Sequence, residues 1–238
     1  ETHTGAMLEP YSDDPKNSGM LYFTQEAMND FVLNAHRKGL QIAVHCEGDA
    51  AIEQVLSAYE NALTAFPRND HRHRIEHCEV PTAEQVCRIA KAGVALGMQP
   101  AFIHHWGQPG GKYETLLGKG RLARCHPYRR LVDLGILFAG GSDSFVTPID
   151  PILGIHALVN ASFENQRISV KEALKAFTIN AARIAFEENA KGTIEAGKNA
   201  DLVVLSNDPF KVEPSKIRDI KVLMTIVGGN LAYDTDQA

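Results

Sequence analysis

Apolar positions along the chain alternate between helical and strand-like spacing. They recur every three or four residues over 24–38, and a short continuous apolar run follows over 40–44. The first pattern is typical of an amphipathic helix and the second of a buried strand. The same helix-then-strand pair repeats three times, with strands expected at 74–76, 94–98 and 136–139. Strands that alternate with helices predict right-handed crossover units and a parallel sheet.

Capping signals locate the helix starts. Thr82 with Gln85, and Ser169 with Glu172, have the spacing of capping boxes. Thr24 and Asp49 are single N-cap candidates, for helices that run to about residues 38 and 65. Further helices are expected over 128–134, 152–159 and 180–186. The connection 101–125 is rich in Gly, His and Lys, and we expect a long loop there.

The pattern changes near residue 190. Short apolar runs at 192–194, 200–205 and 222–227 are separated by turn residues and predict strands, and Gly229-Asn230 is a candidate hairpin turn. The first twenty residues show no period. We therefore expect a loop over 1–20, an α/β unit over 21–187 and a small β unit over 188–238.

Composition narrows the class of protein. The 238 residues are 44% hydrophobic and 22% charged, which excludes a disordered or collagen-like chain. A net charge of -5 without basic clusters argues against nucleic-acid and membrane partners, and no apolar run approaches the roughly 20 residues of a membrane span. Four cysteines without a CxxC pair predict reduced thiols in a cytoplasmic protein. The chain begins at Glu1 without a methionine, so we expect it to be part of something longer.

Polar side chains follow the predicted strands. His45, His77, Gln99 and Asp143 each come directly after a strand or its closing glycines. Carboxyl ends of parallel strands meet at one edge of a sheet, so these side chains should converge. A single histidine is more often structural, but three potential metal ligands at three strand ends, His45, His77 and Asp143, predict a metal site. Imidazole and carboxylate ligands suit zinc.

Other histidines are interpreted from their positions. His104, His105 and Trp106 lie in the long connection, where they form either a substrate wall or an ordinary surface loop. His71 and His73 precede a strand, so we expect them at the opposite end of the sheet and not as a metal pair. A phosphate-binding glycine loop and a GxSxG elbow are both absent from the sequence.

Four stretches, in this order, resemble segments of the amidohydrolase superfamily, and within it the amidohydrolase family 3 type. They are IAVHCEGDAAIEQVL, RHRIEHCEV, GILFAGGSDSFVTPIDP and the tail from residue 173 to 210 with its GTIEAGKNADLVVL segment. The resemblance implies the C-terminal half of a (β/α)8 TIM-type barrel, followed by part of a small β-sandwich. It also implies a metal centre with one or two zinc ions, and hydrolysis of amide-like C–N bonds in a small-molecule substrate.

The resemblance also implies roles for individual residues. His45 and His77 match metal ligands, and Asp143 matches a residue that binds metal and shuttles protons. Gln99 and Arg121 match positions near the substrate. Zinc lowers the pKa of bound water to about 7, so the expected mechanism is attack of metal-bound hydroxide on a carbonyl while Asp143 moves the proton to the leaving nitrogen.

Part of the family's ligand set is missing from this sequence. The HxH pair of the first strand and the bridging residue of the fourth are absent. Two histidines are fewer than the three ligands that a zinc site needs, so we expect zinc to bind this chain weakly or not at all. A single-metal deaminase of the same superfamily and a non-catalytic, hydrolase-like binding or regulatory domain stay open as alternatives. Half a barrel leaves strand edges unpaired, which predicts a homo-oligomer.

Overall fold

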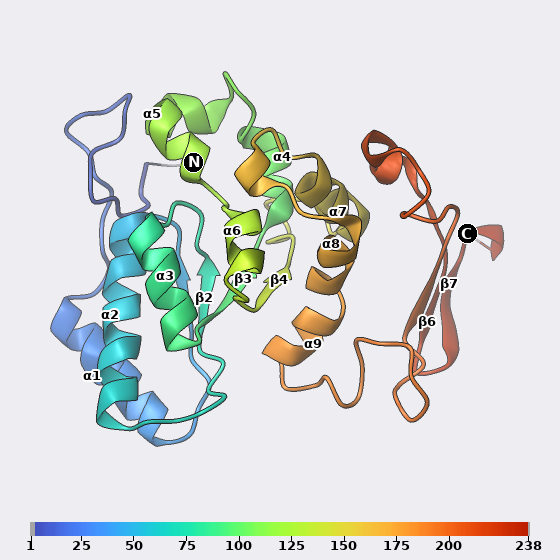
Figure 1. The fold of residues 1–238 in the computed structure, drawn as a ribbon, viewed down its shortest axis with the longest axis horizontal. Coiled ribbons are helices and arrows are strands. Elements are labelled where there is room, and N and C mark those ends of the chain that lie inside the picture. The colour runs from blue at the N-terminus through green and yellow to red at the C-terminus, as the bar shows by residue number, and fades with distance from the viewer. Residues whose placement is uncertain (1–2, 238) are drawn as a thin grey trace.

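A four-stranded parallel sheet forms the centre of the molecule. The computed structural model describes residues 3–237. Strands β1 (Ala43–Cys46), β2 (Arg74–His77), β3 (Ala95–Met98) and β4 (Phe138–Gly140) lie in chain order, each parallel to its neighbour (Figure 1). The predicted parallel sheet is therefore confirmed, and the strands end within about two residues of the predicted positions.

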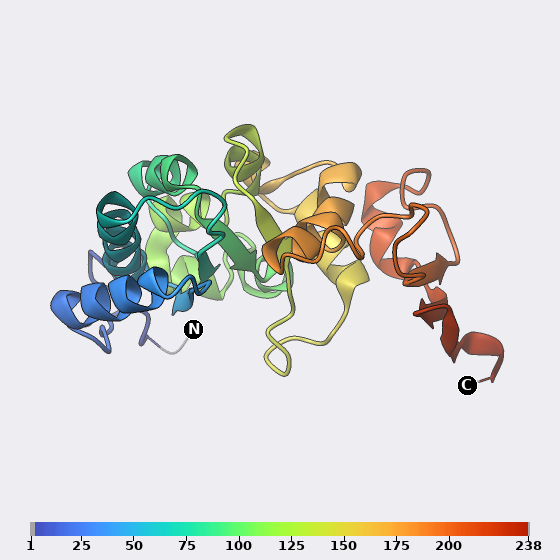
Figure 2. The same ribbon diagram turned by 90° about the horizontal axis from the view of Figure 1, so that it is seen from below.

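A helix precedes each strand. These are α1 (Gln25–Arg37), α2 (Asp49–Ala65), α3 (Ala83–Ala92) and α6 (Tyr128–Asp133). Helices α1, α2 and α3 lie side by side along the sheet (Figures 1 and 2). Thr24 caps α1, and the capping box of Thr82 and Gln85 opens α3, as predicted. Helix α2 begins one residue earlier than predicted, because Gly48 is its N-cap and Asp49 is its first residue.

The long connection after β3 is helical, so the prediction of a loop over 101–125 is wrong. It contains α4 (Pro100–Trp106) and α5 (Lys112–Arg124). The buried residues of α5 are spaced as on one helix face: Tyr113, Leu116, Leu117 and Leu122. Gly118 lies in the left-handed region with φ 74°, and it kinks α5 in the middle.

Three further helices close the α/β unit. They are α7 (Pro151–Asn160), α8 (Val170–Ala176) and α9 (Ile179–Ile184), with the short 3-10 helix η1 (Glu164–Gln166) before α8. The predicted capping box of Ser169 and Glu172 opens α8. One contiguous core joins the sheet to α7 and α8, and its largest fully buried members include Tyr59, Ile75, Leu96, Phe138 and Leu131.

A small antiparallel sheet follows the α/β unit. Strands β5 (Leu202–Leu205), β6 (Val222–Val227) and β7 (Asn230–Asp234) pair in that order, with η2 (Pro214–Asp219) before β6 and η3 (Thr235–Gln237) after β7. Residues 192–194 form no strand, contrary to prediction. Val227 pairs with Asn230, so the turn is Gly228-Gly229, one residue earlier than predicted; both glycines have positive φ, as a type I′ turn requires. Figure 2 shows this sheet at the end of the molecule away from α1.

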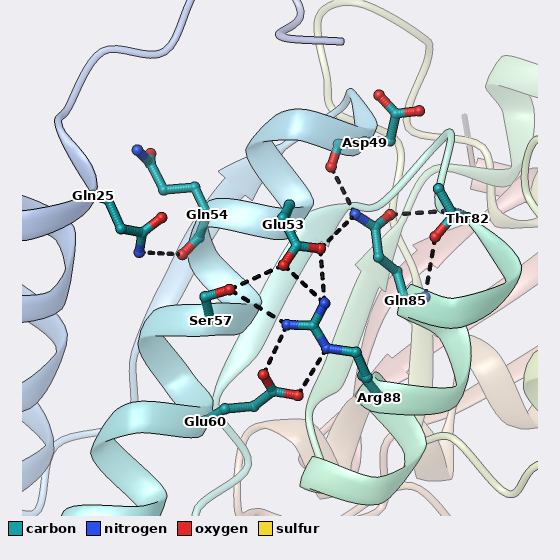
Figure 3. A network of polar contacts seen from close by, with 9 residues as sticks. All are labelled: Gln25, Asp49, Glu53, Gln54, Ser57, Glu60, Thr82, Gln85 and Arg88. Atoms are coloured by element: carbon teal, nitrogen blue, oxygen red, sulfur yellow. Dashed lines mark hydrogen bonds and ion pairs between the residues drawn. The ribbon is translucent and has the colours of Figure 1, made fainter. Parts of the chain in front are cut away.

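A polar network fastens α2 to α3 (Figure 3). The Arg88 guanidinium of α3 donates to the carboxylates of Glu53 and Glu60 on α2 at 2.8–3.0 Å. The Gln85 amide donates to the Asp49 carbonyl at 2.8 Å, at the start of α2. The network therefore sets the position of α2 against α3, beside the carboxyl ends of β1 and β2.

Within residues 3–237, no helix combines the length and the apolarity that crossing a membrane requires.

Candidate functional site

A cavity of about 270 Å³ opens at the carboxyl ends of the strands. Its walls come from the N-terminal segment, β1, α2, α4 and the loop after β4. The polar side chains that line it are Thr4, His45, Glu47, Gln54, Glu79 and Asp143, and the aromatic ones are Tyr22, Phe23, Phe102, Trp106 and Tyr113. His45 and Asp143, two of the side chains expected to converge at the strand ends, both line the cavity, and Trp106 of the long connection lines it as well.

Three side chains in this region could hold a metal ion. His45, Glu47 and His77 each offer a ligand atom, and these atoms lie within 4.8 Å of one another. The rings of His45 and His77 are 4.3 Å apart, and His45 Nε2 lies 3.6 Å from Glu47 Oε1. Two imidazoles and one carboxylate form a ligand set that suits zinc and similar divalent ions. The donor chemistry therefore fits a metal, and we call these residues the ligand group.

Glu47 was not predicted from the sequence. It follows His45 by two residues, just beyond the end of β1, and its carboxylate turns back to the imidazole. The available signal was the His-x-Glu spacing at a strand end. The expectation of weak zinc binding rested on two histidines alone, and Glu47 supplies the third ligand that this argument lacked.

Electrostatic conditions differ among the members of the ligand group. Burial lowers the pKa of His77, but the carboxylates of Glu79, Glu47 and Asp143 outweigh it and raise that pKa overall. Burial and the nearby Glu79 charge raise the pKa of Glu47. Negative charge therefore accumulates around a buried imidazole, which is an environment that attracts a cation.

Asp143 lies in the same cavity but outside the ligand group. It follows β4 by three residues, with a backbone φ of 53°, and lines the cavity with His45 and Glu47. Its charge acts on His77. Its two expected roles, metal ligand and proton shuttle, stay predictions.

The residues expected to contact substrate lie in different parts of the structure. Trp106 lines the cavity, with its ring 4.7 Å from that of Phe102. Gln99 is buried as the N-cap of α4 and is not part of the cavity lining. His104 faces His156 of α7, with the rings 5.4 Å apart, and His105 is exposed. His104, His105 and Trp106 all lie on α4, so they are held by a helix and not by a loop.

Arg121 holds the N-terminal segment. Its guanidinium donates to the carbonyl of Glu9 at 2.9 Å, to that of Pro10 at 2.7 Å and to that of Leu117 at 2.7 Å. The residue is absent from the cavity lining. Its donors serve backbone carbonyls on α5 and the segment beside it, and its expected place near the substrate stays a prediction.

Residues 3–20 contain no helix or strand, as predicted, but they are fixed to the α/β unit. The Ala6 carbonyl accepts from the N–H of Ala50 at 3.1 Å, and the Leu8 N–H donates to Asp49 Oδ1 at 2.7 Å. Arg124 pairs with the same Asp49 carboxylate at 2.6 Å. These contacts place Thr4, Gly5 and Ala6 as one wall of the cavity.

Comparison with known proteins supports a hydrolase. A model of the amidohydrolase family matches residues 1–233. The amidohydrolase YtcJ of Bacillus subtilis is 34% identical over 97% of this chain, and the N-substituted formamide deformylase of Arthrobacter pascens is 29% identical over 91%. The chain spans less than half the length of these relatives, 44% and 41% respectively.

A solved structure agrees with this assignment. An uncharacterized metal-dependent hydrolase from Pyrococcus furiosus superposes on 88% of this chain with a TM-score of 0.77 and 29% identity; the match covers 42% of that protein. The parallel sheet, the histidines at its carboxyl ends and the full-length family match lead to one conclusion. This chain belongs to the amidohydrolase family.

Proposed function

We propose that the protein is a metal-dependent hydrolase that cleaves an amide-type C–N bond in a small molecule. One observation carries the proposal: His45, Glu47 and His77 bring their ligand atoms within 4.8 Å of one another beside a cavity that Asp143 also lines. Metal ligands and a free carboxylate around one cavity are the parts that hydrolysis of an amide requires.

Each residue has a proposed role. His45, Glu47 and His77 hold the metal, for which zinc is the proposed identity. A bound divalent ion polarises a carbonyl oxygen and lowers the pKa of water. Asp143 accepts a proton from the attacking water and delivers it to the leaving nitrogen. Phe102 and Trp106 form an aromatic wall for the substrate, which the N-terminal segment helps to exclude from water.

The α/β unit is proposed to be the C-terminal half of a (β/α)8 barrel. Four parallel strands in chain order are what half of such a barrel would contain, and the chain spans less than half of its relatives. In this proposal residues 21–187 form the half barrel and 188–238 contribute to a small β-sandwich. The open edge of β1 is then covered by further strands or by a second copy of the chain, and the protein is cytoplasmic.

A single-metal deaminase is the second candidate. It is favoured by the number of ligand groups, because the described residues 3–237 contain one such group. Deamination would use the same ligands but would release ammonia. Ammonia release from amino-substituted heterocycles therefore separates the two functions. A non-catalytic, hydrolase-like domain would give turnover with neither substrate class.

The test combines metal analysis with turnover. The purified protein is dialysed, its metal content is measured, and N-substituted formamides and other small amides are offered as substrates. We expect retained metal and release of an amine. His45→Asn should lose both, whereas Asp143→Asn should keep the metal and lose turnover. Lys191→Met, at a surface position that pairs with Glu187 and lies outside the cavity, is the matched control. Retained turnover in Asp143→Asn contradicts the proton-transfer role, and absence of metal in the wild type contradicts the proposal.

A further inference from the structure

The tripeptide His-Cys-Glu occurs twice, at 45–47 and at 77–79, and its two copies differ in geometry. Glu47 approaches the Nε2 atom of His45 at 3.6 Å, whereas Glu79 approaches the Nδ1 atom of His77 at 3.8 Å. Their exposure differs as well. The side chains of His45 and Glu47 are 65% and 31% exposed, and those of His77 and Glu79 are 6% and 8% exposed. The same tripeptide sequence therefore places the Glu47 carboxylate in the ligand group and the Glu79 carboxylate behind the His77 imidazole.

The backbone explains the difference. Strand β1 continues through Cys46, but after Glu76 the chain turns into the left-handed region, with φ 71° at His77 and 49° at Cys78. Residues with a Cβ rarely adopt such angles, and strain of this kind gathers at functional sites. The Cys78 N–H still donates to the Cys46 carbonyl at 2.9 Å, so the turn stays anchored to β1. The turn carries Glu79 to the Nδ1 side of His77.

Glu79 is held in place on its other side. The Tyr113 hydroxyl of α5 donates to Glu79 Oε2 at 2.8 Å. His126 Nε2 lies 3.8 Å from the same oxygen, and the His126 ring is fully buried with neither nitrogen in a hydrogen bond. The backbone N–H of His126 donates to the backbone carbonyl of Glu79 at 2.8 Å. A buried carboxylate is thus fixed between residues from three parts of the chain.

Within residues 3–237, the Nδ1 atom of His77 lies 3.8 Å from the Glu79 carboxylate. The atom is buried and makes no hydrogen bond in the structure, and Glu79 Oε1 is the charged oxygen that faces it. An imidazole whose Nδ1–H points at a carboxylate has its Nε2 lone pair free. Metal-binding histidines commonly have such a carboxylate behind them, because it fixes both the tautomer and the ring orientation.

We propose that Glu79 is a positioning residue that holds His77 in the Nδ1–H tautomer, with Nε2 directed to the ligand group, and that Tyr113 and His126 hold Glu79 for this task. The inference rests on the proposed metal site. It assigns the two copies of the tripeptide different roles: Glu47 binds the metal and Glu79 orients a ligand. Glu79 itself is not a member of the ligand group.

The first test reads the tautomer in metal-free protein. At a pH high enough to make His77 neutral, nitrogen-15 NMR of the histidine rings should show its single ring proton on Nδ1 in the wild type. Glu79→Gln keeps an oxygen acceptor and should keep this tautomer, whereas Glu79→Leu should give a mixture. A wild-type His77 protonated on Nε2 overturns the proposal without any reference to metal binding.

The second test is a cobalt(II) titration of the same proteins, followed by absorbance. Glu79→Leu should weaken cobalt binding by about 10- to 100-fold. Glu79→Gln and Tyr113→Phe should have smaller effects, and Glu60→Gln, a carboxylate of the α2–α3 network, should have none. Cobalt affinity within threefold of the wild type in Glu79→Leu overturns the positioning role. A wild type that binds no cobalt overturns the proposed function instead, and with it this inference.

Discussion

His36 Nδ1 and His73 Nε2 are 2.8 Å apart in the interior of the protein. The Ile42 N–H donates to His73 Nδ1 at 3.1 Å, so the proton of His73 is on Nε2 and is donated to His36. His36 Nε2–H in turn donates to the Phe66 carbonyl at 2.7 Å. His71 is bonded through both nitrogens to the backbone of His73 and Ala92. All three rings are therefore satisfied as neutral imidazoles, and none has a lone pair left for metal, which agrees with the interpretation of His71 and His73 from the sequence.

This cluster predicts a loss of stability in mild acid. Burial, together with His71 and Arg68, lowers the pKa of His73 to about 3, and burial also lowers that of His71. The unfolded chain protonates these rings near pH 6.5, so it binds more protons than the folded chain between about pH 6.5 and 3. Stability is complete above pH 6.5 and decreases as pH falls, by up to about 1.4 kcal/mol per pH unit from His73 and by a further amount from His71. Urea unfolding between pH 5 and 7.5 measures the slope.

A comparison of variants isolates the cluster from other titrating groups. His73→Phe keeps a ring beside Tyr59 but cannot take up a proton, so its slope between pH 5 and 6.5 should be smaller than that of the wild type. His105→Asn changes an exposed ring and should keep the wild-type slope. Equal slopes in His73→Phe and the wild type would contradict the assignment.

Local signals made the helices predictable. A capping box depends on residues three apart, and Thr82 with Gln85 and Ser169 with Glu172 form the expected reciprocal bonds. The loop predicted over 101–125 is wrong because the apolar spacing of Tyr113 and Leu116 is helical, although this stretch is rich in glycine and histidine. A glycine inside a helix costs only about 1 kcal/mol, which buried leucines can offset.

The site was predictable only in part. The convergence of His45, His77 and Asp143 follows from parallel strands, whose carboxyl ends share one edge. The proposed role of Glu79 does not follow from the His-Cys-Glu sequence, because it depends on left-handed backbone at His77 and Cys78 and on contacts with α5. The contacts of Arg121 with the N-terminal segment could not be predicted for a similar reason: those partners lie more than 100 residues away along the chain.

Arg124→Met should loosen the N-terminal segment. The substitution leaves the Asp49 carboxylate, which is only 4% exposed, without its ion pair. A buried acceptor that loses a charged partner costs about 2 kcal/mol. We expect urea unfolding to show a decrease of this size in the free energy of unfolding, and we expect faster proteolysis of residues 3–20. Lys191→Met breaks an exposed pair with Glu187 and should leave stability nearly unchanged. Unchanged proteolysis in Arg124→Met would show that Asp49 does not hold the segment.

Gly48→Ala should disturb the same contact by sterics alone. A Cβ at Gly48 would lie 2.1 Å from the Ala6 carbonyl oxygen, so the N-terminal segment must move away from the start of α2. Overpacking of this kind costs about 1–3 kcal/mol. The matched control is Gly120→Ala in α5, where a Cβ meets nothing within 4 Å and helix propensity should raise stability by up to about 1 kcal/mol. Thermal unfolding of the two variants should therefore shift in opposite directions, and a shift in the same direction would contradict the contact.

Arg88→Met should separate α2 from α3. The guanidinium bonds two carboxylates of α2 at once, and its side chain is only 23% exposed (Figure 3). Because planar, bidentate pairing is specific to arginine, Arg88→Lys should restore only part of the lost stability. We expect Arg88→Met to lower the free energy of unfolding by about 1–2 kcal/mol. This exceeds the range for isolated surface pairs, because one guanidinium pairs with two carboxylates. A double-mutant cycle with Glu60→Gln should give a coupling energy of at least about 0.5 kcal/mol. Lys216→Met, which breaks an exposed pair with Asp219, should leave stability unchanged. A coupling energy of zero would mean that the network of Figure 3 contributes packing and not charge pairing.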